Sequence, residues 1–139
     1  MTENGERKYN MAQILTSMDF LMKYSAVWQA EIGEEFFTRD HWFVFNECCR
    51  SKWENRSFTV SDAIRTMPWV APAVARARIE EAEKAGLLEI VPSETDGRIK
   101  HVLPSEALEN KVKDVFVATV DLFRDTLEDL ADEGPFPRR

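Results

Sequence analysis

The chain has 139 residues, a length that suits one domain, or one domain with helical extensions. Hydrophobic residues make up 44% of the sequence, including four Trp and nine Phe, so the chain can bury a core of large side chains. It has no run of about 18 apolar residues, and its polar start lacks the apolar segment of a secretory signal. We therefore expect a cytoplasmic protein without a membrane-spanning helix.

The formal net charge of −7 is unusual for a protein that binds nucleic acid. The acidic residues, however, are concentrated at the two ends of the chain: residues 1–50 carry a net −3 and residues 114–139 a net −4. Residues 51–113 have ten basic and ten acidic side chains. The middle of the chain is therefore its least acidic part, which permits a surface that faces DNA without requiring one.

Two helices are predicted in the N-terminal part of the chain. In residues 11–32, apolar side chains recur at intervals of three and four, which indicates a long amphipathic helix that Gly33 would end. Its methionine-rich stripe suits helical packing or a dimer interface better than a ligand-binding surface. The second helix runs from the N-cap Thr38 to about Ser51, and we expect a surface or capping position for His41 in its first turn.

Two adjacent cysteines, Cys48 and Cys49, lie near the end of that second helix. No further cysteine or histidine cluster could complete a metal site, and neighbouring helical positions point too far apart to form a disulfide with each other. We expect two reduced thiols, at least one of them buried, and neither a metal nor a cofactor. A redox-sensing role is the alternative, although the sequence contains no resolving cysteine.

A short helix and a longer one follow, separated by a turn. Thr59 as N-cap and Asp62 three residues later resemble a capping box, and Pro68 ends the short helix. Pro72 suits the first position of the next helix, which Gly86 ends as a C′ residue. Two helices of these lengths, joined by a proline-marked turn, are typical of a helix-turn-helix.

The remainder predicts a hairpin and a final long helix. Residues 87–91 and 99–103 have the apolar character of strands, and the PSETDG segment between them has turn chemistry. Ser105 can cap a helix whose apolar stripe continues to about residue 131. That stripe is longer than a small domain can cover alone, so we expect a partner.

The segment ARIEEAEKAGLLEIVPSETDGRIKHVLPSEAL resembles the MarR-type winged helix-turn-helix regulators. Their recognition helix ends in a Leu-Glu-x-x-Gly-Leu pattern and their wing carries an Asp-x-Arg motif. Here the corresponding segments are AEKAGL at 82–87, DGR at 96–98 and LPS at 103–105, and the order of elements over 11–131 also agrees. Ala82 replaces the usual leucine, and Pro104-Ser105 replaces the threonine at the strand end.

The resemblance implies a mainly α fold with a small β-wing. It implies one winged-helix domain over residues 1–139, with the helix-turn-helix and wing at about 59–103. Long N- and C-terminal helices at about 11–32 and 105–131 would form the dimer.

Helical spacing places Ala75, Ile79 and Ala82 toward the core, so that Ala73 and Arg76 face outward with Pro72, Glu80 and Glu83. Arg76 is the one strong donor to guanine edges or phosphates on that outer face. The resemblance implies that a wing arginine lies in or beside the minor groove, held by an aspartate and followed by a phosphate contact. The predicted DNA-binding residues are Thr59, Ser61, Ala73, Arg76, Asp96, Arg98 and Lys100.

Each of these assignments has a simpler alternative. Arg76 and Arg98 can be solvated charges on an exposed helix and a tight hairpin. Thr59 and Ser61 can serve only to cap a helix. Trp28, Trp42 and Phe45 are candidates for an effector pocket, with ordinary core packing as the competing interpretation.

The sequence contains no Ser/Cys–His constellation, no glycine-rich phosphate loop and no metal-ligand spacing, so we do not expect an enzyme. The resemblance implies a dimeric transcriptional regulator that binds double-stranded DNA at a roughly palindromic site. A small-molecule effector would change the spacing of its two lobes. The net charge and the nearly bare recognition helix leave one alternative, a winged-helix protein-interaction module that has lost DNA binding.

Overall fold

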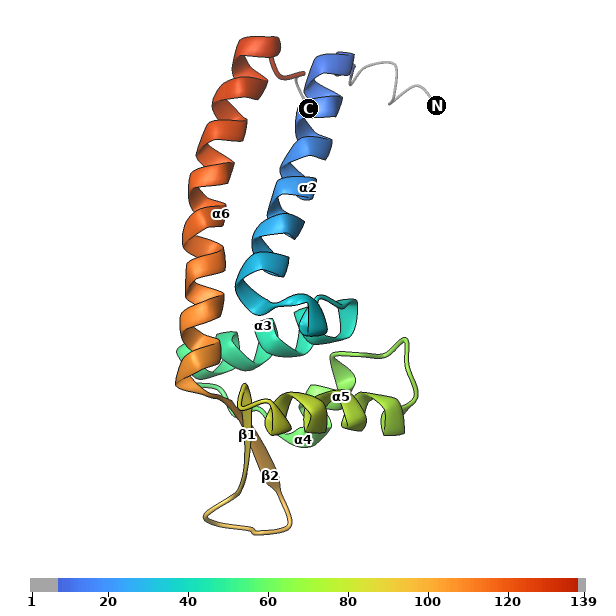
Figure 1. Cartoon of the computed structure of the whole chain (residues 1–139), viewed down its shortest axis with the longest axis vertical. Coiled ribbons are helices and arrows are strands. Elements are labelled where there is room, and N and C mark those ends of the chain that lie inside the picture. The colour runs from blue at the N-terminus through green and yellow to red at the C-terminus, as the bar shows by residue number, and fades with distance from the viewer. Residues whose placement is uncertain (1–7, 138–139) are drawn as a thin grey trace.

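The structure is a computed structural model that describes residues 8–137. Its elements in chain order are α2 (Met11–Ile32), the 3₁₀ turn η1 (Glu34–Phe36), α3 (Arg39–Trp53), α4 (Val60–Arg65), α5 (Pro72–Lys84), β1 (Leu88–Pro92), β2 (Lys100–Pro104) and α6 (Glu106–Glu133). Figure 1 shows a long arm made by α2 and α6 side by side, with α3, α4, α5 and the hairpin gathered at one end of it. The predicted domain of 1–139 includes residues 1–7 and 138–139, which lie outside the described residues.

Local capping chemistry sets the helix starts. The side chains of Thr38, Thr59 and Ser105 each accept a hydrogen bond from the amide three residues later, as predicted. Asn10 and Gln13 form a further capping box at the start of α2. The predicted helix starts are therefore confirmed.

The two strands lie one residue later than predicted. They pair antiparallel, from Leu88 opposite Pro104 to Pro92 opposite Lys100. The amide of Leu87 donates instead to the carbonyl of Ala82, 2.9 Å away, so that Leu87 completes the end of α5 and not the start of a strand.

The core lies where α3, α5, the hairpin and the first turns of α6 meet. Ala75, Ile79 and Ala82 of α5 are buried, as their spacing predicts. They pack with large side chains that include Trp28, Phe45, Met67, Leu88 and Leu108. Burial of these apolar surfaces is the main favourable contribution to folding.

A surface position for His41 was one of two predictions, and it is wrong because the ring is buried. The other, a role at the helix cap, agrees with the contact between Thr38 and the His41 ring. The ring lies between Phe36 of η1 and Phe45 of α3, with centroid distances of 4.8 and 5.5 Å. The backbone amide of His41 is the group that Thr38 caps. The first turn of α3 packs against η1 and α5, so the side chain of His41 is enclosed there.

Cys48 and Cys49 are both free and buried, as predicted. Burial raises the pKa of both thiols, that of Cys49 to about 12, so both are protonated at neutral pH. A protonated, buried thiol is a poor nucleophile, which disfavours the redox alternative.

Within residues 8–137, no group of three or more His, Cys, Asp or Glu side chains is placed to hold a metal ion. Among the same residues, no helix has the length and apolar character needed to cross a membrane.

Candidate nucleic-acid interface

A concave groove of about 400 Å³ lies between the start of α4, the outer face of α5 and the β1–β2 hairpin, the predicted wing. It is lined by Thr59, Val60, Ser61, Arg76, Arg98, Ile99 and Lys100. Five of the seven residues predicted to bind DNA thus meet on one surface. Ala73 and Asp96 lie outside the lining.

The walls of the groove are tied together by backbone contacts. Thr59 forms an isolated β-bridge with His101 of β2, and the amide of Val102 donates to the carbonyl of Phe58 at 2.8 Å. Thr59 also caps α4, because its hydroxyl accepts from the amide of Asp62 at 3.1 Å. Its capping role is therefore present, and it leaves the start of α4 beside the wing.

Arg76 and Ala73 lie on the exposed face of α5. Within residues 8–137, neither Arg76 nor Lys100 forms an ion pair, whereas Arg78 and Arg98 both do. Glu80 and Glu83 are also exposed and lie nearer the end of the helix. The groove therefore offers two unpaired cations to a ligand, and the acids of α5 lie outside its lining.

The wing holds Arg98 through Asp96. The Asp96 carboxylate accepts from Nε and Nη2 of Arg98 at 3.2 and 3.1 Å, and from its backbone amide at 3.1 Å. These hydrogen bonds from Arg98 hold the pKa of Asp96 below its ordinary value. The Arg98 side chain is nevertheless 90% exposed, so its guanidinium is oriented but open to solvent.

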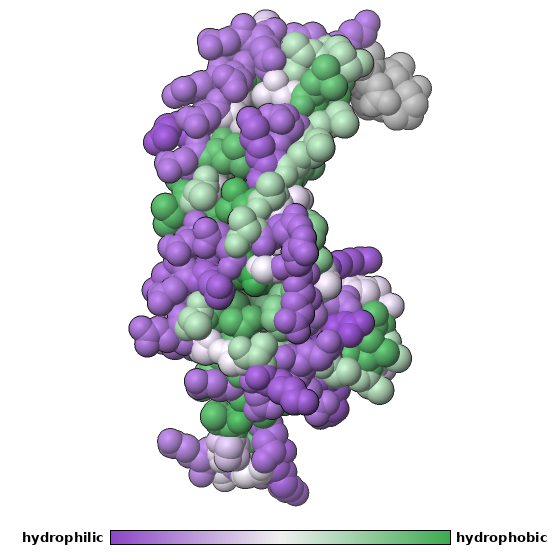
Figure 2. Space-filling view, viewed as in Figure 1, coloured by the Kyte–Doolittle hydropathy of each residue, from purple (hydrophilic) through white to green (hydrophobic). Residues whose placement is uncertain are grey.

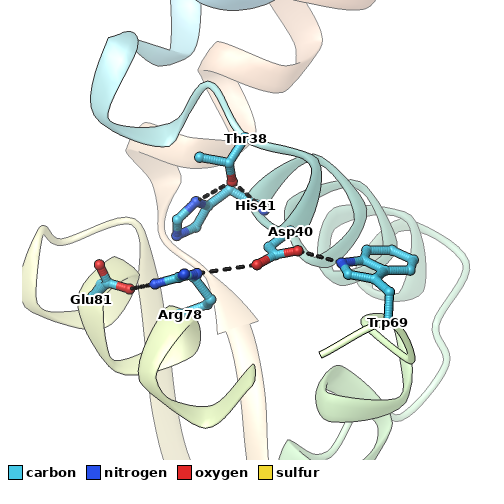
Figure 3. A network of polar contacts seen from close by, with 6 residues as sticks. All are labelled: Thr38, Asp40, His41, Trp69, Arg78 and Glu81. Atoms are coloured by element: carbon cyan, nitrogen blue, oxygen red, sulfur yellow. Dashed lines mark hydrogen bonds and ion pairs between the residues drawn. The ribbon is translucent and has the colours of Figure 1, made fainter. Parts of the chain in front are cut away.

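A polar network joins α5 to the first turn of α3 (Figure 3). The Asp40 carboxylate accepts from Nε of Arg78 at 3.1 Å and from the indole Nε1 of Trp69, in the turn between α4 and α5. Arg78 also donates to Glu81 at 2.9 Å. Arg78 lies at the edge of the core-facing side of α5, which is why it reaches sideways to acids and not toward the groove.

The charged form of Asp40 is favoured by its partners. Burial alone would raise the pKa of this carboxyl, but the hydrogen bonds from Trp69 and Arg78 outweigh burial and hold the pKa below its ordinary value. Asp40 is therefore ionised at neutral pH and can hold both partners at once.

A second, smaller hollow of about 240 Å³ lies where α2 meets α3. It is lined by Tyr24, Ser25, Trp28, Phe37, Thr38, Arg39 and Trp42. Two of the three predicted effector residues, Trp28 and Trp42, therefore line it. Trp28 is at the same time a core residue, only 1% exposed. Phe45 does not line the hollow and packs in the core against Phe36 and His41.

The sequence matches no protein-family model and no curated protein significantly. Solved structures, in contrast, share its fold. Tm0710, a transcriptional regulator from Thermotoga maritima, is 14% identical and superposes with a TM-score of 0.59, covering 84% of this chain and 78% of its own. The heme sensor protein PefR from Streptococcus agalactiae is 19% identical and superposes with a TM-score of 0.53, covering 82% of this chain and 72% of its own.

A third similar structure is BpsR from Bordetella bronchiseptica, whose DNA binding is regulated by 6-hydroxynicotinic acid. It is 16% identical and superposes with a TM-score of 0.50, covering 86% of this chain and 83% of its own. All three superpose over more than two thirds of their own length and over more than four fifths of this chain. This chain has a MarR-type winged-helix fold.

In this winged-helix frame, α5 occupies the position of the recognition helix and the β1–β2 hairpin that of the wing. Among these proteins with the same fold, Tm0710 is a transcriptional regulator and PefR is a heme sensor.

Sequence reasoning missed the roles of Asp40, Trp69 and Arg39 in this winged helix. The sequence predicts a first helical turn around Asp40 but no contact for its side chain, and it predicts no role for Trp69. Asp40 lies in the first turn of α3 and Trp69 in the turn between α4 and α5, so no local pattern indicates that they meet. Contacts between positions 29 and 38 residues apart do not follow from such a pattern.

Proposed function

We propose that this chain is a transcriptional regulator that binds double-stranded DNA as a homodimer at a roughly palindromic site. The observation that carries the proposal is the groove in which Arg76 of α5 meets Arg98 and Lys100 of the wing. Exposed cations along one concave surface suit phosphate oxygens, whose neutralisation releases counterions and drives binding. This role also requires the cytoplasmic location expected from the sequence.

In this proposal α5 enters the major groove, and its outer face makes few but distinct contacts. Arg76 donates to a guanine edge or a phosphate, and Ala73 contacts a thymine methyl group. Arg98, oriented by Asp96, enters the minor groove, where the negative potential is enhanced. The remaining predicted residues, Thr59, Ser61 and Lys100, contact the phosphate backbone.

The arm supports the homodimer. Its helices expose a series of large apolar side chains to solvent, with exposed fractions of 54% for Met18, 69% for Met22, 64% for Val120 and 56% for Leu127. Figure 2 shows hydrophobic surface along the arm, between polar side chains. A second copy related by a two-fold axis would cover such surface, and the same symmetry would place two recognition helices on a palindrome.

The hollow between α2 and α3 supports a small-molecule effector. Trp28, Trp42, Phe37 and Tyr24 offer aromatic walls, and Arg39 offers one cation. This lining suits a flat aromatic acid, whose ring stacks on the aromatic side chains while its carboxylate pairs with the guanidinium. The regulation of BpsR by 6-hydroxynicotinic acid, a molecule of this class, is consistent with the proposal.

A winged-helix interaction module that has lost DNA binding is the second candidate. Glu80 and Glu83 favour it, because both are exposed on the outer face of α5 and would repel phosphates close to them.

A salt titration on random-sequence duplex separates the two candidates. We expect measurable binding at low salt that falls steeply as salt rises. Arg98→Ala and Arg76→Ala should each weaken binding and lower the slope of log K against log salt by about one. Arg50→Ala, which removes a cation of α3 outside the groove, is the matched control and should leave binding unchanged. An absence of binding at low salt would reject the regulator and favour the interaction module.

A further inference from the structure

We infer that Asp40 is the positioning residue that holds recognition helix α5 in register with the wing. The inference rests on the proposed DNA-binding function and deepens it. Asp40 touches no predicted DNA contact and acts through Arg78 and Trp69, which its two carboxylate oxygens hold separately (Figure 3). One side chain of α3 thus holds both the recognition helix and the turn that leads into it.

The turn between α4 and α5 is held against α3 on several sides. The guanidinium of Arg39 lies 3.8 Å from the Trp69 ring centroid, and the Phe43 ring meets Trp69 edge-on at 4.9 Å. Asp40 supplies the hydrogen bond to the indole N–H. Residues 39, 40 and 43 all belong to the first two turns of α3, so this short segment determines where α5 begins.

Arg78 has two acidic partners, Asp40 and Glu81, and only one of them can orient α5 relative to α3. Glu81 lies three residues later on the same helix, so this contact moves with α5 and cannot orient it. Asp40 belongs to another element, and only 14% of its side chain is exposed, against 48% for Glu81. The contact with Asp40 is therefore the less screened of the two and the one that fixes the rotation of α5.

The rotation of α5 matters because Arg76 and Arg78 face different ways. Arg76 lines the protein groove between α4, α5 and the wing, together with Arg98 and Lys100, while Arg78 faces α3. If α5 turned about its axis after loss of the Asp40 contact, Arg76 would move relative to the wing. A site that needs both contacts in register would lose affinity, whereas non-specific binding to phosphates tolerates such a shift.

Two variants of equal charge test this inference. Asp40→Asn and Glu81→Gln each remove one negative charge and replace one acceptor oxygen near Arg78 by an NH2 group. Only Asp40→Asn disrupts the contact between elements, because it leaves a single acceptor oxygen where Arg78 and Trp69 need one each. Affinities are measured on a duplex selected from a random library by the wild-type protein, and on random duplex. We expect Asp40→Asn to weaken binding to the selected site by roughly tenfold and to leave random-duplex binding unchanged.

Glu81→Gln should keep the wild-type ratio of the two affinities. Loss of folded protein would lower both affinities together, so an unchanged ratio for Asp40→Asn would overturn the inference. The inference would also be overturned if Asp40→Asn and Glu81→Gln had the same ratio of selected-site affinity to random-duplex affinity.

A second measurement does not depend on DNA. With 5-fluorotryptophan in the full chain, ¹⁹F NMR resolves the four Trp positions, and Trp69→Phe identifies the Trp69 signal. We expect Asp40→Asn to shift that signal and Glu81→Gln to leave it in place. An unchanged Trp69 signal in Asp40→Asn would contradict the inference, even if the wild-type chain failed to bind DNA and only the proposed function were lost.

Discussion

The side chain of His41 is enclosed by Phe36 and Phe45, beside the network that holds α5. Its Nδ1 lies 2.7 Å from the hydroxyl of Thr38, and its Nε2 is buried without a hydrogen-bond partner in the part of the chain that the structure describes. Burial lowers the pKa of His41 below the ordinary 6.5, and the nearby carboxylates of Glu81 and Asp40 do not offset this effect. The neutral imidazole is therefore the form that the fold accommodates.

This lowered pKa makes stability depend on pH. Below about pH 6.5 the unfolded chain binds a proton at His41 before the folded chain does, so the free energy of unfolding falls as the pH falls. The expected slope is at most about 1.4 kcal/mol per pH unit. Urea unfolding at pH 7.5 and 5.5 should show this loss in the wild-type protein and a smaller loss in His41→Phe. Equal losses in the two proteins would contradict the assignment.

The measurement is best kept above pH 5, because Asp40 contributes in a different window. Its pKa lies below the ordinary 3.8, so its contribution is complete above that pH and is lost as the pH falls through its lowered folded-state value.

The junction between α5 and β1 sets the direction in which the wing leaves the recognition helix. Gly86 has a φ of +79°, a left-handed conformation that glycine adopts without strain. Its amide donates to the carbonyl of Glu83, and the next amide, that of Leu87, donates to Ala82. This hydrogen-bonded turn buries Leu87 and starts β1 at Leu88, so the place of the wing depends on one backbone conformation.

Gly86→Ala should therefore destabilise the protein through its backbone alone. A Cβ at this position meets nothing within 4 Å, so no clash adds to the cost, which we expect to be about 1 kcal/mol. Gly97→Ala is the matched control, since Gly97 lies in the wing turn with equally open surroundings and no positive φ. Urea unfolding of both variants measures the difference. A larger cost at Gly97 would show that the φ of Gly86 is not the cause.

In the arm, α2 and α6 bury one face of each other and leave apolar side chains on their other faces exposed. The helices pack against each other through ring pairs such as Phe20 with Phe123, whose centroids are 4.6 Å apart. At the free end, the buried Gln13 donates to the carbonyls of Leu130 and Gly134, which satisfies orphan groups at the end of α6. The apolar side chains that face away from this contact carry the proposed dimer.

Introduction of a charge into this apolar surface should separate the dimer. We expect the wild-type chain at micromolar concentration to sediment with twice its mass of 16.1 kDa, and Val120→Lys to shift it toward the monomer, because burial of an unpaired ammonium is costly. Val74→Lys, the same substitution at an exposed valine of α5, should leave the mass unchanged. A wild-type monomer at this concentration would contradict the homodimer.

Features that depend on neighbouring residues were predictable from the sequence. Thr38, Thr59 and Ser105 start helices because each hydroxyl reaches an amide three residues away. The Asp96–Arg98 contact, which the family resemblance implied, spans two residues and is likewise local. Periodicity also identified the buried face of α5, since helical geometry alone determines which residues share a face.

Features that depend on distant residues required the folded structure. The contacts of Asp40 with Arg78 and Trp69, the burial of His41 and the contacts of Gln13 with the end of α6 all join separate elements. Trp42 lines a hollow, Trp28 lies between that hollow and the core, and Phe45 lies wholly in the core, although the three residues have similar hydrophobic character. Local chemistry determines where helices and turns form, but a side chain's surroundings depend on how those elements pack. For this chain, the sequence specified the winged helix and its candidate DNA contacts, and packing determined how α3 holds them in place.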